Sequence, residues 1–535
     1  MRRNNDDSIG DSRSDHNRIS TPHGARAARA IAAGGAVLLL LTIIAGAASA
    51  VKGNRVANPV LRIGYNSAGI SPNPALDNCC AQTDVGLSLA YEPILHLRTD
   101  GTVAPGLATS WGFVKTTAGP NKKFEFTLRH NASFSNGQPV TADAVRNWLS
   151  YYASANGPFA SVFGPNPTFS VDGGWTVVVQ TENPTPSMPF LLSEMRNAGY
   201  VAAPAAVADP TAFATASYGA GPYMLDPSRT VSGDHYTFVP NPYYYDKSKV
   251  KWSEVDVKII TVPSTMLTAL QSGQLDVAGG DPSTVSAARS SGFAVYWASS
   301  GTCFLGLDAS GRSAPLADIR VRQALSYAID RNALEKTVFG GYALPTSEFV
   351  TTDGFDPKYR NYYPYNPAKA TALLAAAGYP NGFSLNLLGA PGYSNFDQIV
   401  ASYFNAVGVK VNVASAPNTS VFVQQLAAAT SPIFQGCAQS LPYSVVLYPN
   451  VLRPSGFYNP YKISDPVINH LFYTGLKSKD PSSDFEQISR RVVEQAIQMP
   501  LVTNTQFWYA TTKVGGVSPT NARTGQTFAS EWYPK

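Results

Sequence analysis

The chain has 535 residues, of which 44% are hydrophobic and 14% are charged, so it can bury more than one substantial core. Its formal net charge of +5 is small for this length, and no Lys/Arg run is interleaved with aromatic residues as a nucleic-acid groove requires. These features argue against a largely disordered chain and against a nucleic-acid partner.

The N-terminal part of the chain has the composition of an export signal. Residues 1–29 are polar and are predicted to form a disordered cytoplasmic tail or the n-region of a leader. Residues 30–51 contain no charged side chain and end near Ala48-Ser49-Ala50, which fits the cleavage site of a signal peptide. The same run is long enough for an N-terminal membrane anchor. Both interpretations stay open, and both place the remaining chain outside the cytoplasm.

The first clear element beyond this region is a strand, a turn and a helix in succession. Phe124, Phe126 and Leu128 alternate with polar residues, as a strand with one buried face requires. Asn136-Gly137 then favours a turn, and Thr141 is predicted to cap the helix that follows.

Further along, strand-like and helix-like stretches alternate, which predicts an α/β protein. We expect strands at residues 257–262 and 275–278, with a helix between them that ends before Gly273. A second helix is predicted where Val321, Ala324, Leu325, Ala328 and Ile329 form one apolar stripe after the cap candidate Asp318.

Several segments carry a family resemblance in addition to this pattern. They are residues 124–145, Tyr91–Ile94, Pro105–Trp111, Gly219–Tyr223, Asn241–Tyr244, Leu270–Ala278, Asp318–Arg331 and Leu373–Tyr379. In this order they resemble the family 5 solute-binding proteins of ABC importers, which include oligopeptide, dipeptide and nickel receptors.

The resemblance implies a two-lobed α/β fold of the periplasmic-binding-protein type (type II, large cluster C form). Lobe I is expected at residues 57–300 with an inserted subdomain at about 80–205, and lobe II at 301–498. Residues 499–535 are expected to return to lobe I and form a C-terminal tail, so that two strands cross between the lobes and act as a hinge.

The resemblance also implies that the protein binds a solute and catalyses no reaction. We expect an extracytoplasmic receptor, at the outer face of the cytoplasmic membrane or in the periplasm. It captures a peptide-like or other polar solute between its lobes and delivers it to the permease subunits of an ABC importer. We expect a monomer that needs no cofactor.

Two alternatives from other classes remain, a membrane-anchored ligand sensor and a secreted hydrolase. The sequence contains no G-x-S-x-G, H-E-x-x-H, P-loop or dinucleotide-binding glycine pattern, and no histidine pair at metal-ligand spacing. We therefore expect no catalytic residues and no metal site.

The cysteines are expected to include one disulfide. In oligopeptide-binding relatives, positions similar to Cys303 and Cys437 are joined, which implies the same bridge here; two buried free thiols are the alternative. The adjacent Cys79 and Cys80 are left unassigned, because a bridge between neighbours strains the peptide that joins them.

The resemblance nominates ligand-binding residues near the hinge. Phe159 occupies the place of a tyrosine that walls the site in oligopeptide-binding relatives; an ordinary core position is the alternative. Cys303, Phe304, Tyr443 and Trp508 are further candidates, since they lie near the expected crossing strands.

The segment Gly436-Cys437-Ala438-Gln439 bears on ligand specificity. Peptide-binding relatives read tryptophan-cysteine-alanine-aspartate in a similar place, and the aspartate holds the ammonium of the peptide. Gln439 is neutral, and no Asp or Glu occurs between Val421 and Ser464. Because a buried ammonium without a carboxylate is costly, we expect a ligand that is neutral or blocked at this end. Gly436 in place of tryptophan is expected to open space.

Overall fold

The computed structural model describes residues 59–65, 72–77, 84–98, 102–155, 157, 159–194, 196–214, 216–351, 353–440, 444, 447–478, 480–517 and 527–535. Residues 57–535 form one compact unit. The expected tail, the export segment, Cys79 and Cys80 lie outside the described residues. No helix in the described part of the chain combines the length and apolarity that a bilayer crossing needs.

A large mixed sheet runs through residues 57–535, and ten described strands build it. In spatial order they are β14 (Val409–Ser415), β13 (Phe383–Gly389), β15 (Ile433–Gln439), β12 (Ala294–Leu307), β16 (Gln498–Ala510), β11 (Val277–Gly280), β1 (Val60–Tyr65), β10 (Glu254–Ile259), β9 (His235–Pro240) and β8 (Tyr223–Leu225).

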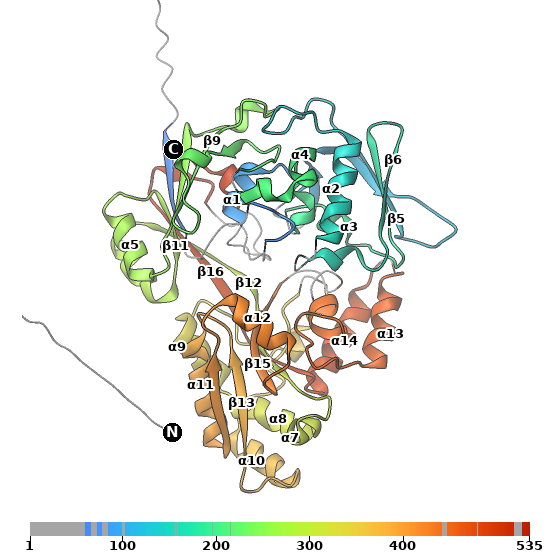
Figure 1. Cartoon of the computed structure of the whole chain (residues 1–535). Coiled ribbons are helices and arrows are strands. Elements are labelled where there is room, and N and C mark those ends of the chain that lie inside the picture. Colours follow the sequence, from blue (N-terminus) through green and yellow to red (C-terminus); the bar gives the residue numbers. More distant parts are fainter. Residues whose placement is uncertain are drawn as a thin grey trace, which may run out of the picture. The chain divides into compact units, whose positions relative to one another are not determined.

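The two central strands, β12 and β16, connect the two halves of this sheet. They are antiparallel to each other along almost their whole length. At one end β16 pairs with β11, which continues to β1 and β10, and at the other end β12 pairs with β15, which continues to β13 and β14. Figure 1 shows β12 and β16 passing from the elements around α5 (Pro263–Gln271) and β11 to those around β13 and α11 (Ser394–Ala406). Two halves joined by two strands are a two-lobed fold, as expected.

Helices cover the sheet on both sides of this connection. Besides α5 and α11 they are α1 (Asp84–Ala90), α2 (Ala142–Ser154), α3 (Met188–Leu191), α4 (Pro204–Ala208), α6 (Val285–Ser290), α7 (Ala314–Ala317), α8 (Ile319–Ala328), α9 (Arg331–Phe339), α10 (Pro367–Ala376), α12 (Thr419–Ala427), α13 (Pro466–Gly475) and α14 (Ser482–Glu494).

A second, smaller sheet confirms the prediction for residues 124–145. Its strands are β4 (Ala108–Phe113), β5 (Lys123–Leu128), β7 (Thr176–Gln180) and β6 (Thr168–Asp172), in that order. Phe124, Phe126 and Leu128 are buried, and the polar residues between them are half-buried. Helix α2 follows with Thr141 as its N-cap, since Thr141 Oγ1 accepts a hydrogen bond from Ala144 N at 3.2 Å.

Helix α8 is also confirmed, and it belongs to a separate core. Asp318 caps it by accepting from Arg320 N at 2.8 Å. Val321, Leu325 and Ala328 on its stripe are buried together with side chains of β12, β13 and β16. This packing gives the second half of the sheet its own hydrophobic core.

The predicted strands around Gly273 are shifted along the chain. The first, β10, covers Glu254–Ile259 instead of 257–262, because Val262 becomes the N-cap of α5 and Pro263 its first residue. Gly273 follows the helix with a φ of 74°, as its C′ role requires. The second strand, β11, begins at Val277 instead of Leu275, because the amides of Gln274 and Leu275 still bond to Ala269 O.

Candidate functional site

The pairing of the two crossing strands is irregular at two places, between Ser299 and Gly301 and between Cys303 and Phe304, and at the first of them β12 carries a β-bulge. Its pairing with β16 shifts register between Ser299 and Gly301, and Gly301 also pairs with Gln439 of β15. A Cβ on Gly301 would lie 2.5 Å from the carbonyl oxygen of Ala438, so only glycine fits this close approach. The end of β15 therefore lies directly against β12 beside the bulge.

A disulfide holds these strands together two residues further on. Cys303 of β12 and Cys437 of β15 are directly paired in the sheet, and the structure joins their sulfur atoms. Cys303 is completely buried in the second core. These are the cysteines that the family resemblance pairs, and the bond acts to fix the register of β12 and β15.

The space expected at Gly436 is filled. A Cβ on Gly436 would lie 3.0 Å from Tyr458 Cε1 and 3.2 Å from Phe304 Cζ. Tyr458 also donates its hydroxyl to Cys437 O at 3.2 Å. The expectation of open space in place of a tryptophan is therefore wrong, because the aromatic ring of Tyr458, distant in sequence, occupies it.

The structure does not place Phe304, Trp508 and Tyr443 together in one site. Phe304 is buried and makes edge contacts with Phe349 at 5.0 Å and Tyr458 at 5.4 Å. Trp508 is 3% exposed and packs against Trp532 at 5.4 Å. Tyr443 lies outside the described residues. The ligand role of all three stays a prediction. In this structure the side chains of Phe304 and Trp508 pack against other aromatic side chains of the hydrophobic core.

Phe159 and Gln439, by contrast, are brought together by an arginine that the sequence analysis did not single out. Arg196 Nη1 donates a hydrogen bond to Gln439 Oε1 at 2.9 Å, over a sequence separation of 243 residues. The same guanidinium lies over the ring of Phe159, 4.6 Å from its centroid. Arg196 is only 1% exposed, whereas Phe159 and Gln439 are half-buried.

Arg196 is held in place by the short helical turn that follows it, Asn197–Gly199. Its carbonyl oxygen accepts from Gly199 N at 3.0 Å, and the indole of Trp148 on α2 donates to Ala198 O at 3.0 Å. Asn197 donates to Asp77 Oδ2 at 3.3 Å. A lone arginine in an apolar stretch was the one available signal for this residue, and no motif marks it.

Glu194, two positions before Arg196 in the sequence, belongs to a buried cluster of charged side chains. His96 contacts Glu194 Oε1 through Nδ1 at 2.6 Å and Glu92 Oε1 through Nε2 at 3.0 Å. Tyr244 donates to Glu92 Oε2 at 3.0 Å, and Tyr245 donates to Glu92 Oε1 at 2.5 Å. Burial disfavours the imidazolium, but the two carboxylates outweigh it and raise the pKa of His96 to about 10. Burial also acts to raise the pKa of Glu92, but the imidazolium overcomes it and lowers that pKa to about 2.

This cluster predicts a pH dependence of stability. His96 has a raised pKa in the folded state, so its contribution is complete below the unfolded pKa of about 6.5 and is lost as the pH rises towards 10. We expect the free energy of unfolding to fall by roughly 3 kcal/mol between pH 6.5 and 10 through this group. Urea denaturation of the wild type and of His96→Gln across this range tests it, since the variant should lack this fall.

His235 provides the matched control for the His96 prediction. It also contacts a carboxylate, Asp234 Oδ2 at 2.6 Å, but its side chain is 42% exposed. His235→Gln should keep the wild-type pH dependence, because an exposed pair contributes little. A His96→Gln curve parallel to that of the wild type would contradict the assignment.

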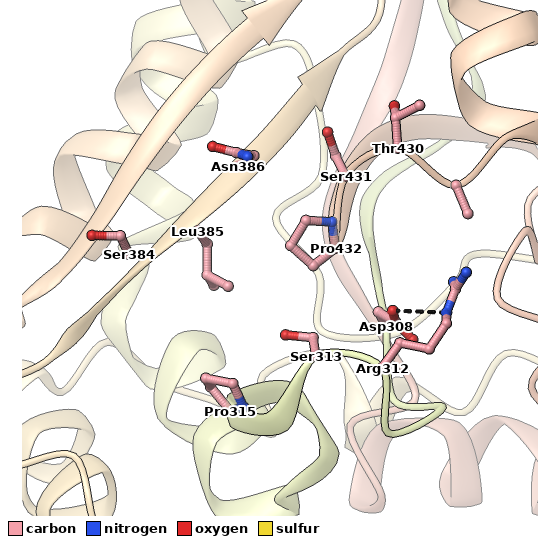
Figure 2. A pocket seen from close by; sticks show the side chains of 11 residues that line it. Asp308, Arg312, Ser313, Pro315, Ser384, Leu385, Asn386, Thr430, Ser431 and Pro432 are labelled. Carbon is pink, nitrogen blue, oxygen red and sulfur yellow. Dashed lines mark ion pairs between the residues drawn. The ribbon is translucent and has the colours of Figure 1, made fainter.

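A separate pocket lies in the second half of the sheet, with a volume of about 510 Å³. It lies beyond the end of β12, roughly 20 Å along an extended strand from Gly301. Figure 2 shows its polar lining and the ion pair between Asp308 Oδ2 and Arg312 Nε at 3.3 Å. The other lining residues are Ser313, Pro315, Ser384, Leu385, Asn386, Ala429, Thr430, Ser431 and Pro432. None of the residues nominated from the sequence contributes to it.

Metal ligation is not indicated in the described part of the chain, where no group of three or more His, Cys, Asp or Glu side chains could hold an ion. The site geometry instead combines a guanidinium, an amide and an aromatic ring next to a bulged strand connection. Two lobes joined by crossing strands, with such groups beside the connection, define a two-lobed binding protein.

Comparison with known proteins gives the family. Residues 102–448 match the bacterial extracellular solute-binding proteins, family 5 (Middle). The chain belongs to this family, whose members are periplasmic or extracytoplasmic solute-binding proteins of ABC importers. The nickel-binding periplasmic protein of Escherichia coli (strain K12) is 24% identical to it over 454 residues, which cover 77% of this chain and 83% of the relative.

Solved structures support the same fold. The periplasmic binding protein AgaA of A. tumefaciens R10, in complex with agropinic acid, has a TM-score of 0.78 at 21% identity, and the match covers 89% of this chain and 99% of AgaA. The dipeptide-binding protein of Pseudoalteromonas sp. SM9913, in complex with Met-Leu, has a TM-score of 0.77 at 19% identity, covering 89% and 100%. These relatives and neighbours are binding proteins and not enzymes.

Proposed function

We propose that this chain is an extracytoplasmic receptor that captures a polar solute between its two lobes and delivers it to the permease of an ABC importer. The lobes are assigned as residues 57–300, with an inserted subdomain at about 80–205, and residues 301–498, with 499–535 returning to the first lobe. The observation that carries the proposal is the hydrogen bond from Arg196 to Gln439, because it joins a first-lobe segment to the end of a second-lobe strand.

Capture works through closure of the lobes around the solute. Arg196 and Gln439 can meet only when the lobes are together. They therefore mark the two facing surfaces between which a solute would bind. If closure buries ~300 Å² of apolar solute surface, at ~25 cal/mol per Å² it gains ~7 kcal/mol before entropic losses. This gain is compatible with micromolar affinity.

The chemistry at Gln439 restricts the solute. The amide is neutral and its oxygen accepts a hydrogen bond from a cationic guanidinium. An α-ammonium placed here would meet a like charge instead of a carboxylate, which is costly in a buried site. The solute therefore has no free α-amine at this end; a modified peptide, a glycoside or another polar metabolite fits this requirement. Relatives that bind a dipeptide or agropinic acid do not decide among these.

A thermal-shift screen of polar solutes, followed by calorimetry, tests the proposal. A solute that binds only the folded protein should stabilise it by about 2.7 kcal/mol at a concentration of 100 Kd. We expect N-acetylated dipeptides to bind at least as tightly as the same dipeptides with a free α-amine. Tight binding that depends on a free α-amine would contradict the proposed polarity of the site, and chemical turnover of a bound solute would contradict the receptor function.

A further inference from the structure

We propose that Arg196 determines the specificity of the site and that the transported solute presents an oxyanion, a carboxylate or a phosphate, to its guanidinium. This inference rests on the proposed function, because it names the class of solute for the same site. It goes beyond the absence of a free amine, since it requires a negative charge on the solute at the Gln439 end.

A buried guanidinium at this place has an energetic cost. Arg196 is 1% exposed, and an arginine side chain is almost always charged. Removing such a charge from water is costly and must be balanced by hydrogen bonds or opposite charge. The guanidinium is a cationic group at the place where the two lobes meet, and an anionic group of the solute is the chemistry that complements it.

The side-chain amide of Gln439 is the acceptor for Arg196 in this structure. Gln439 Oε1 lies 2.9 Å from Arg196 Nη1, and it is a neutral amide oxygen contributed by the opposite lobe. A carboxylate or phosphate oxygen at the same place would make a charge-assisted hydrogen bond, which is roughly twice as strong, and could engage the fork of the guanidinium with two oxygens. An anionic solute therefore competes with Gln439 for Arg196, whereas a neutral solute gains nothing over it.

The ring of Phe159 forms a second side of the site. The guanidinium carbon of Arg196 lies 4.6 Å from the centroid of the half-buried Phe159 ring, so the cation is held beside an aromatic face. A planar fork held in this way recognises an oxyanion attached to an apolar or ring-bearing body, since the body can pack next to Phe159.

A carboxylate lies near Arg196 and would favour a cationic solute, so the experiment must distinguish an anionic from a cationic solute. Asp77 accepts from Asn197, the neighbour of Arg196. If the solute were cationic, Asp77 would be the group that holds it. Asp77→Asn tests that alternative. The matched control for Arg196→Gln is Arg229→Gln, which removes an exposed guanidinium paired with Asp226 and Glu254.

The experiment uses the purified full chain and calorimetric titration with three pairs of probes that differ in charge. The pairs are gluconate and sorbitol, glucose 6-phosphate and glucose, and N-acetyl-alanyl-phenylalanine and its C-terminal amide. We expect the anionic member of at least one pair to bind more tightly than its neutral partner. Arg196→Gln should reduce that advantage about 10- to 100-fold, and Arg229→Gln should leave it intact. The gluconate and phosphate arms distinguish the two sources of the oxyanion.

A second variant covers the case in which Arg196→Gln fails to fold. Gln439→Glu keeps Arg196 and places a carboxylate of the protein opposite it, so it should also weaken the anionic probe at least 10-fold while the melting temperature is kept or raised. Unchanged affinity for the anionic probe in Gln439→Glu would overturn the inference.

The remaining outcomes separate this inference from the proposed function. If neutral probes bind as tightly as anionic ones, the receptor function stands and the role of Arg196 is refuted. The same holds if the anionic probe is insensitive to Arg196→Gln but is lost in Arg312→Ala, which would place it in the pocket of Figure 2. If no anionic probe of any pair binds, the inference is overturned, while the proposed function is tested separately by the thermal-shift screen.

Discussion

Reduction of the disulfide between Cys303 and Cys437 is expected to lower the free energy of unfolding by about 3 to 5 kcal/mol. The bond closes a loop of 134 residues, so its removal restores a large chain entropy to the unfolded state. It also joins β12 to β15 beside the bulge at Gly301, so its loss should loosen the connection between the lobes. Denaturant titration with and without reductant measures the effect.

The control for this prediction removes the other thiols from the comparison. In a Cys79→Ala/Cys80→Ala background, reductant can act only on Cys303 and Cys437, and the further change Cys303→Ala/Cys437→Ala should make stability independent of reductant. Alkylation followed by mass measurement should show two protected cysteines before reduction. Equal denaturation midpoints in oxidised and reduced protein would contradict a stabilising bridge.

Trp532→Ala is expected to destabilise the fold by about 3 to 5 kcal/mol, although only three residues follow Trp532 in the sequence. Trp532 is fully buried against Trp508 of β16, and its indole donates to Thr527 Oγ1 at 2.9 Å. Its carbonyl oxygen accepts from the indole of Trp252 at 2.9 Å. The truncation leaves a cavity in the hydrophobic core that Trp532 shares with Trp508 and Trp252.

Two further variants separate burial from mere loss of a tryptophan. Trp532→Phe keeps most of the ring and should cost about 1 to 2 kcal/mol. Trp297→Ala removes a side chain from a residue that is 45% exposed and should change stability by less than 1 kcal/mol. Reversible urea unfolding of the three variants is the measurement, and equal effects of Trp532→Ala and Trp297→Ala would refute the role of the C-terminal return.

The site was only partly predictable from the chain. The resemblance selected Phe159 and Gln439, and the structure places one guanidinium in contact with both. Arg196 itself was missed, because a residue becomes a partner across 243 positions only when the sheet order and the strand register are known. Gly436 shows the reverse case, since its open space was inferred from a missing side chain while Tyr458 fills it from elsewhere in the sequence.

Local interactions explain what the sequence determined by itself. The alternation in β5, the cap of α2 at Thr141 and the stripe of α8 after Asp318 depend on neighbours a few residues apart, so they can be read from the chain directly. The ends of β10 and β11 moved by two or three residues, because helix capping at Val262 and pairing with other strands decide where a strand stops.

Only the tertiary structure decided which polar groups meet beside the crossing strands. Gly301 of β12 pairs with Gln439 at the end of β15, and Gln439 accepts a hydrogen bond from Arg196. That meeting depends on contacts between distant parts of the chain, whose positions follow from sheet order and core packing and not from the order of residues. For this reason the sequence was sufficient for the family and its elements, whereas the charge of the site became visible only in the folded chain.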